Sequence, residues 1–114
     1  MEDDSILDSQ LTASSEYNPN HGPHLARLDA VAGAGIGGWA ALTLDSNQWI
    51  QVDFDGTLKT VSGIITQGRQ DYAQWVTEYR VQYSNDGVNW KYVKDEDNLD
   101  AVSVNKALQM GLHC

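Results

Sequence analysis

Hydrophobic and polar residues alternate along much of the chain, which predicts β-strands because successive side chains of a strand point to opposite faces. The clearest alternation lies at 49–54, and Asp55-Gly56 follows it with residues typical of a tight turn. A β-branched run at 61–67 predicts a second, more buried strand. A shorter strand is expected at 11–14. The pattern therefore favours an all-β chain of antiparallel strands.

The strongest local signal is a hairpin at 79–93. Asp86-Gly87 lies between two alternating runs, and a two-residue type I′ loop requires positive φ at both central residues, which this pair tolerates. With these two residues as the whole loop, Tyr83 pairs with Trp90 and Val81 pairs with Tyr92. All four side chains then share one face of the hairpin.

That face is expected to belong to the hydrophobic core. The remaining aromatic candidates are tryptophans, which bury large areas in small β-proteins. The residues expected in the core are Trp39, Trp49, Trp75, Val81, Tyr83, Trp90 and Tyr92.

Residues 16–48 show little periodicity and hold both prolines of the chain, so they predict long loops. Long loops in a compact domain usually carry function. The stretch after residue 101 has no clear pattern.

Length and charge narrow the classes of function. A chain of 114 residues forms one domain. Its net charge of −9 argues against nucleic-acid binding, which draws its affinity from basic residues that neutralise phosphates. The same charge disfavours simple electrostatic docking on anionic membranes. No apolar run reaches the roughly 18 residues of a membrane-spanning helix, and the acidic start does not resemble a signal peptide.

The sequence contains partial motifs for catalysis, metal binding and cofactor binding, but each lacks the further residues or structural elements that such a site requires. Residues 33–38 match G-x-G-x-x-G but lack the surrounding βαβ unit. The acidic run after Asp95 has leucine and lysine where an EF-hand needs ligands. His21 and His24 lack the further nitrogen or sulfur ligands that zinc requires, and no serine lies in a G-x-S-x-G elbow. We expect no cofactor, no metal and no enzyme activity.

Aromatic and polar residues on the predicted loops are better suited to recognition. Tyr17 and His21 lie in a polar loop and are expected at the surface, and Arg69 and Tyr72 lie in another. Aromatic faces beside a guanidinium suit sugar rings and peptide side chains.

Six ordered motifs carry a resemblance to a known family. They are the DSQLTASS run from Asp8, the ARL run from Ala26, the NQWIQVD run from Asn47, the ITQGR run from Ile65, the WVTEY run from Trp75 and the VQYSNDGVNW run from Val81. In this order they resemble the coagulation factor V/VIII type C domain, also called the discoidin domain. The family fold is an antiparallel β-sandwich, a distorted jelly-roll barrel with galactose-binding-like architecture.

The resemblance implies an extracellular, non-catalytic binding module for cell adhesion, in which loops at one end of the sandwich hold the ligand. The first loop corresponds to 16–24, the second to 38–47 and the third to 69–75. The implied ligand-binding residues are Tyr17, His21, Leu44, Asp45, Arg69, Asp71 and Tyr72. Arg27 and Gln67 are implied to be structural and to make buried polar contacts.

Two departures from the family pattern shape the expected domain boundaries. The opening family cysteine has no counterpart, so Cys114 would be half of an extracellular disulfide without its partner. Residues 101–114 do not match the family's last strands. We therefore expect an incomplete discoidin domain at 1–100, with C-terminal strands missing, and an unmatched tail at 101–114.

The sequence leaves three classes of function to compare for this chain. The favoured one is lectin-like or protein-binding adhesion, with a cell-surface glycan or protein as the partner and a location outside the cell or on its outer face. The alternative is peripheral binding to anionic phospholipid of the phosphatidylserine type, which the net charge of −9 disfavours. Enzyme function has no supporting site.

Overall fold

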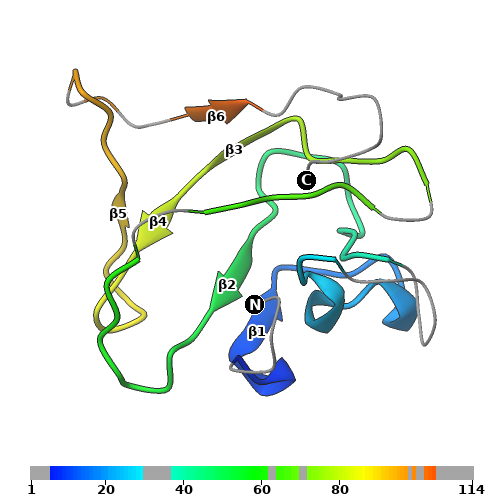
Figure 1. The fold of residues 1–114 in the computed structure, drawn as a ribbon, viewed down its shortest axis with the longest axis horizontal. Helices are drawn as coiled ribbons and strands as arrows, with labels where there is room; N and C mark the ends of the chain where they lie inside the picture. The colour runs from blue at the N-terminus through cyan, green and yellow to red at the C-terminus, as the bar shows by residue number, and fades with distance from the viewer. Residues whose placement is uncertain are drawn as a thin grey trace.

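The computed structural model describes residues 6–29, 37–61, 64–69, 72–97, 99 and the backbone of 102–104. Within these ranges all helical segments are short 3-10 turns, and the strands pair antiparallel (Figure 1). The elements are η1 (Asp8–Gln10), β1 (Leu11–Ala13), η2 (Pro19–His21), η3 (Pro23–Leu25), β2 (Ile50–Val52), β3 (Glu78–Arg80), β4 (Gln82–Tyr83), β5 (Lys91–Tyr92) and β6 (Val102–Val104).

Strand β1 pairs with β2, which confirms the strands predicted at 11–14 and 49–54. Leu11 lies opposite Val52, and Ala13 lies opposite Ile50. Backbone hydrogen bonds extend this ladder at both ends, from Ser14 N to the Trp49 carbonyl (2.9 Å) and from Asp53 N to the Gln10 carbonyl (2.8 Å). The alternating pattern of 49–54 therefore becomes a ladder with a fixed register.

The best-buried part of the described structure surrounds the start of β1. Leu11 is 4% exposed, and the neighbouring Gln10 is 8% exposed. The Gln10 amide is satisfied in this setting, because Nε2 donates to the Asp53 carbonyl (2.7 Å) and Oε1 accepts from Leu7 N (2.8 Å). A buried polar group with both ends bonded fixes the geometry of the segments that it joins.

Strand β3 pairs with β6, so residues 102–104 form a two-stranded sheet with β3. Glu78 lies opposite Val104 and Arg80 opposite Val102. The pattern of the sequence after residue 101 did not reveal this strand, since three residues are too few to display alternation.

The hairpin of β4 and β5 exists, but the predicted register is wrong by one residue. Gln82 pairs with Tyr92 and Tyr83 pairs with Lys91. The loop between the strands is longer than Asp86-Gly87 and is stabilised by its own side chains. Ser84 Oγ accepts from Gly87 N (2.9 Å), and Asp86 Oδ1 accepts from Val88 N and from Asn89 N (2.8 Å each). Such local side-chain bonds compete with the ladder for backbone groups.

This one-residue shift separates the aromatic side chains. Residues that pair across a ladder share a face and neighbours along a strand do not, so Tyr83 and Tyr92 lie on opposite faces of the hairpin. Four of the expected core aromatics are exposed: Trp49 (49%), Tyr83 (54%), Trp90 (40%) and Tyr92 (37%). Three of them lie on the hairpin, whose described strands β4 and β5 form a sheet of two strands only. Trp39, Trp75 and Val81 are half-buried.

The strand predicted at 61–67 is also wrong for the residues that the structure describes. Residues 61 and 64–67 make no strand ladder, and Ile64 and Ile65 are 50% and 78% exposed. A β-branched run favours extended backbone, but a strand needs a neighbour to receive its hydrogen bonds.

The carboxylate of Asp86 sets the pH response of the hairpin loop. It accepts from the backbone amides of Asn89 and Val88, from Asn89 Nδ2 and from Ser84 Oγ. These bonds, the Asn89 amide first, hold the pKa of Asp86 well below the ordinary 3.8.

The sign of the pH effect follows from that lowered pKa. The loop's contribution to folding is complete above the ordinary pKa and is lost as the pH falls through the lower, folded-state pKa. In an NMR titration of the side-chain carboxyl carbon, Asp86 should titrate at lower pH in the folded chain than in the urea-unfolded chain. The Asn89→Ala variant should move the folded midpoint upward, and identical folded and unfolded midpoints would contradict the assignment.

Candidate ligand-binding surface

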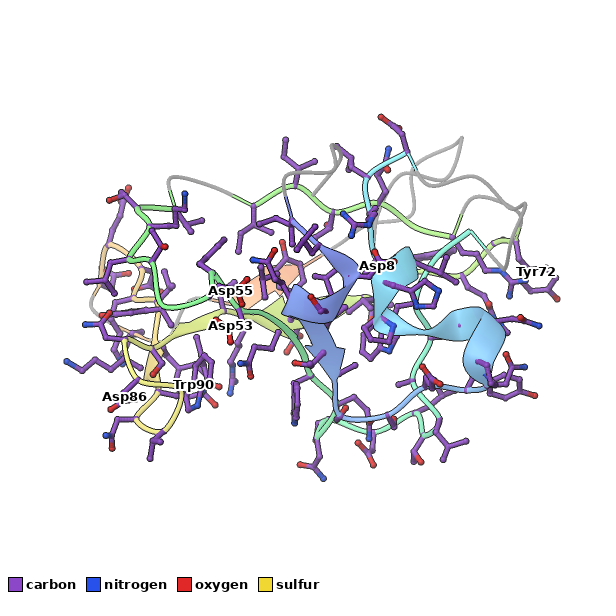
Figure 2. The ribbon with its side chains drawn as sticks, turned by 90° about the horizontal axis from the view of Figure 1, so that it is seen from below. Asp8, Asp53, Asp55, Tyr72, Asp86 and Trp90 are labelled. Carbon is purple, nitrogen blue, oxygen red and sulfur yellow. The ribbon has the colours of Figure 1, made fainter. Side chains whose placement is uncertain are left out.

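The backbone brings the three predicted loops together at one end of the molecule. Tyr17 N donates to the Ala40 carbonyl (2.8 Å), and Ala40 N donates to the His21 carbonyl (3.2 Å), so the first and second loops are paired. A Cβ atom on Gly38 would lie 3.8 Å from Arg69 Cα, which places the second loop against the third. Figure 2 shows Tyr72 at this end, with Asp86 and Trp90 at the opposite end.

The first loop presents Tyr17 and buries His21. Asn18 caps η2, since its Oδ1 accepts from Asn20 N (2.9 Å) and contacts His21 Nδ1 (2.7 Å). The His21 ring meets the Tyr17 ring edge-on at 5.1 Å between centroids. His21 is 7% exposed, so the expectation that it lies at the surface is wrong, whereas Tyr17 is 61% exposed. His21 therefore supports the aromatic face that Tyr17 offers to solvent.

A Cβ at Gly22, which follows η2, would meet two neighbouring side chains. A Cβ there would lie 2.7 Å from His24 Nδ1 and 2.8 Å from Glu16 Oε2. The close approach lets η2 run directly into η3, which keeps the first loop compact.

The second loop projects two leucines. Leu44 is 100% exposed and Leu42 is 62% exposed. Beside them the Asp45 carboxylate accepts from Gln48 Nε2 (3.0 Å) and Asn47 N (2.9 Å), and these two bonds lower the pKa of Asp45. Asp45 thus folds the loop on itself.

Gln48 anchors the second loop to the end of β1. Its Oε1 accepts from Ser14 Oγ (2.8 Å) and from Ser15 Oγ (2.6 Å). The half-buried Trp39 adds a second anchor, because its Nε1 donates to the Ser15 carbonyl (2.9 Å). The anchored base leaves the leucines as the free tip.

The third loop holds Arg69 over an aromatic ring. The guanidinium carbon lies 5.3 Å from the centroid of the Tyr72 ring, and Nη1 donates to Gln74 Oε1 (2.9 Å). The backbone closes the same turn, since Arg69 N donates to the Gln74 carbonyl (2.9 Å). Tyr72 is 63% exposed. Asp71, also predicted here, lies outside the described residues.

Gln67 fixes the base of the third loop. Its Nε2 donates to Asp29 Oδ1 (2.9 Å), and its Oε1 accepts from Asp29 N (2.5 Å). Asp29 has a positive φ of 57°, a conformation that costs a non-glycine residue and is offset by this two-point contact. Gln67 thus makes polar contacts as predicted, but they are not buried, because Asp29 is exposed.

Arg27 makes the polar contacts predicted for it, and its side chain is largely buried. Its Nη2 donates to the Ile6 carbonyl (2.8 Å) and to Asp8 Oδ1 (2.6 Å), and its Nε donates to the His24 carbonyl (3.2 Å). The guanidinium thereby fastens the start of the chain to the first loop.

The supporting residues Asn18, Gln48 and Gln74 were missed by sequence reasoning. Asn18 carried a signal, since asparagine directly before proline is typical of an N-cap followed by Pro at the first helical position. Gln48 and Gln74 carried no such signal. The partners of Gln48 are serines distant in sequence, and the contact of Gln74 with Arg69 depends on how the third loop closes.

The chemistry of this surface is that of binding. The described residues contain no group of three His, Cys, Asp or Glu side chains able to hold a metal ion. In the same part of the chain no helix is long and apolar enough to cross a bilayer. What the surface offers is exposed aromatic rings, a stacked guanidinium and two apolar tips.

A family model, the F5/8 type C domain, matches residues 10–109. The chain belongs to this family. The F5/8 type C domains are known as binding modules.

Relatives and solved structures agree with this assignment. Lactadherin from Rattus norvegicus is 40% identical over 104 residues, which cover 84% of this chain and 24% of lactadherin. Retinoschisin from Mus musculus is 37% identical over 100 residues, with 84% of this chain and 44% of retinoschisin covered. The chain thus spans less than half of these relatives.

The fold is that of discoidin II from Dictyostelium discoideum. Its native structure superposes with a TM-score of 0.74 at 31% identity, covering 91% of this F5/8 type C chain and 40% of discoidin II. The predicted all-β sandwich of the discoidin type is confirmed, and the described strands form no closed barrel.

Proposed function

We propose that this F5/8 type C domain is an extracellular, non-catalytic adhesion module that binds a glycan or protein ligand through its three loops. The contact set is Tyr17 from the first loop, Leu44 from the second, and Arg69 with Tyr72 from the third. The observation that carries the proposal is their shared location: separate segments of sequence meet at one end of the molecule and expose aromatic rings beside a guanidinium.

The physical chemistry of these groups favours a sugar or peptide ligand. The exposed Tyr17 and Tyr72 rings offer flat apolar faces, which stack on the C–H faces of sugars or on peptide side chains. Arg69 is oriented by Tyr72 and Gln74, so little side-chain entropy is lost when a ligand oxygen accepts from it. The net charge of −9 does not oppose a neutral ligand and works against nucleic acid.

A glycan array probed with the whole chain tests the proposal. Replacing Tyr17 and Arg69 by alanine should weaken binding of any captured glycan by about tenfold, the factor expected when one or two contacts of about 1 kcal/mol are lost. Tyr83→Ala is the matched control, because Tyr83 is 54% exposed but lies on the hairpin away from the loops. Unchanged binding by the double variant would refute the proposed surface.

Anionic phospholipid is the second candidate, and the exposed tips of the second loop favour it. Leu44 and Leu42 are exposed on the second loop, and the third loop, which lies against it at Gly38, carries the basic Arg69. Exposed apolar residues combined with a basic residue are what a loop that inserts between anionic head groups requires. Sedimentation with phosphatidylserine vesicles distinguishes the two candidates. Binding that Leu44→Ala abolishes would favour lipid, with Leu58→Ala, a leucine 75% exposed outside the loops, as the control.

A further inference from the structure

The chain contains the dipeptide Asp-Gly twice, and the two copies differ in the hydrogen bonds around them. One copy, Asp55-Gly56, follows β2, and the other, Asp86-Gly87, lies in the β4–β5 loop. Asp-Gly is the aspartyl sequence in which the following amide attacks the side chain most readily, because glycine offers no steric obstruction. Figure 2 shows both aspartates on the side of the molecule away from Tyr72.

The Asp55-Gly56 turn is held by its backbone and by one side-chain bond, in which Asp53 Oδ1 accepts from Asp55 N (2.8 Å). Both residues have positive φ, 52° and 77°, which is the type I′ pattern, and Thr57 N donates to the Phe54 carbonyl across the turn (3.1 Å). No described residue donates to the Asp55 carboxylate or accepts from Gly56 N–H. Both residues are exposed.

The Asp86-Gly87 copy is enclosed by hydrogen bonds. Gly87 N–H donates to Ser84 Oγ (2.9 Å), so the nucleophile is occupied. The carboxylate accepts from Val88, from Asn89 twice and from Ser84, so the electrophile is held in its ionised form by four hydrogen bonds. Reaction requires these bonds to break together.

We propose that Asp55-Gly56 is a site of spontaneous isoaspartate formation in the folded chain and that the Asp86-Gly87 loop is protected from the same modification. In the first step Gly56 N bonds to Asp55 Cγ, the Cγ–O bond breaks, and the amide proton and the departing hydroxyl leave as water. In the second step one water opens the succinimide. Attack at Cγ restores aspartate, and attack at the main-chain carbonyl of Asp55 gives isoaspartate, with no net change in atoms or electrons.

Ageing the whole chain at neutral pH in heavy-oxygen water tests this proposal. Each passage through the succinimide inserts one heavy oxygen, which peptide mass mapping locates, and enzymatic methylation of isoaspartyl carboxyls counts the isomer. Residue 55 should be modified at least about tenfold faster than residue 86, the factor that one retained charge-assisted hydrogen bond supplies. In the urea-unfolded chain the two rates should converge, because the difference arises from folding.

A single substitution probes the protection directly. Ser84→Ala removes the acceptor for Gly87 N–H, so modification at residue 86 should rise while that at residue 55 stays unchanged. Equal rates at the two sites in the folded chain, or faster modification at residue 86, would overturn the proposal. So would an absence of modification at residue 55 over a period in which the unfolded chain is modified there.

Discussion

Replacing Leu11 by alanine is expected to lower the free energy of unfolding by about 3 kcal/mol, within the range for large-to-small substitutions at buried sites. Leu11 is 4% exposed and is the one buried hydrophobic side chain in the described structure. It lies opposite Val52 in the β1–β2 ladder, so its loss removes apolar contact where the two strands meet. Urea unfolding followed by tryptophan fluorescence measures the change as a lower midpoint.

The chain supplies a matched control for this experiment. Leu44→Ala removes the same atoms from a side chain that is 100% exposed, so its unfolding midpoint should equal that of the unmodified chain. If Leu11→Ala and Leu44→Ala unfold at the same urea concentration, the placement of the core around β1 is incorrect.

The second large effect is expected for Arg27→Ala, with a loss of about 2–3 kcal/mol, since bonds from a charged donor contribute more than neutral ones. The side chain of Arg27 is 16% exposed, and its guanidinium donates to the carbonyls of Ile6 and His24 as well as to Asp8. Removing it leaves two backbone acceptors without that donor and detaches the start of the chain from the first loop. Thermal unfolding gives the loss of stability.

The partner variant separates the ion pair from the carbonyl contacts. The Asp8 side chain is 69% exposed, so Asp8→Asn should cost no more than about 0.5 kcal/mol, as is usual for solvent-exposed pairs. Arg27→Lys should be intermediate, because one ammonium group cannot reach acceptors on separate segments as a guanidinium fork does. An Asp8→Asn loss as large as that of Arg27→Ala would show that the ion pair, rather than the carbonyl contacts, stabilises this region.

The identity of the domain was available from the sequence because its motifs are local and ordered. The same was true of the short-range structure. The alternation at 49–54 predicted β2, Asp55-Gly56 predicted the turn that follows, and the 79–93 pattern predicted a hairpin. Each of these depends on residues close in sequence, which propensity and periodicity describe well.

Two of the errors share one physical cause, which is the choice between competing hydrogen-bond partners. Asp-Gly permits a two-residue loop, but Ser84 and Asp86 bond to loop amides and lengthen it. That choice shifted the register and placed Tyr83 and Tyr92 on opposite faces. His21 was expected at the surface because its loop is polar, yet the bond to Asn18 turns it inward.

The sequence by itself determined the family, the strands at β1 and β2, the β4–β5 hairpin and the positions of the three loops for which we propose recognition, since these follow from local patterns and ordered motifs. Only the tertiary structure decided which residues of those loops face solvent. Tyr17, Leu44 and Tyr72 are exposed while His21 is buried, and the guanidinium of Arg69 is oriented by Tyr72 and Gln74. Exposure and orientation depend on contacts between distant segments, such as Gln48 with β1 and Gln67 with Asp29, and no local pattern records them.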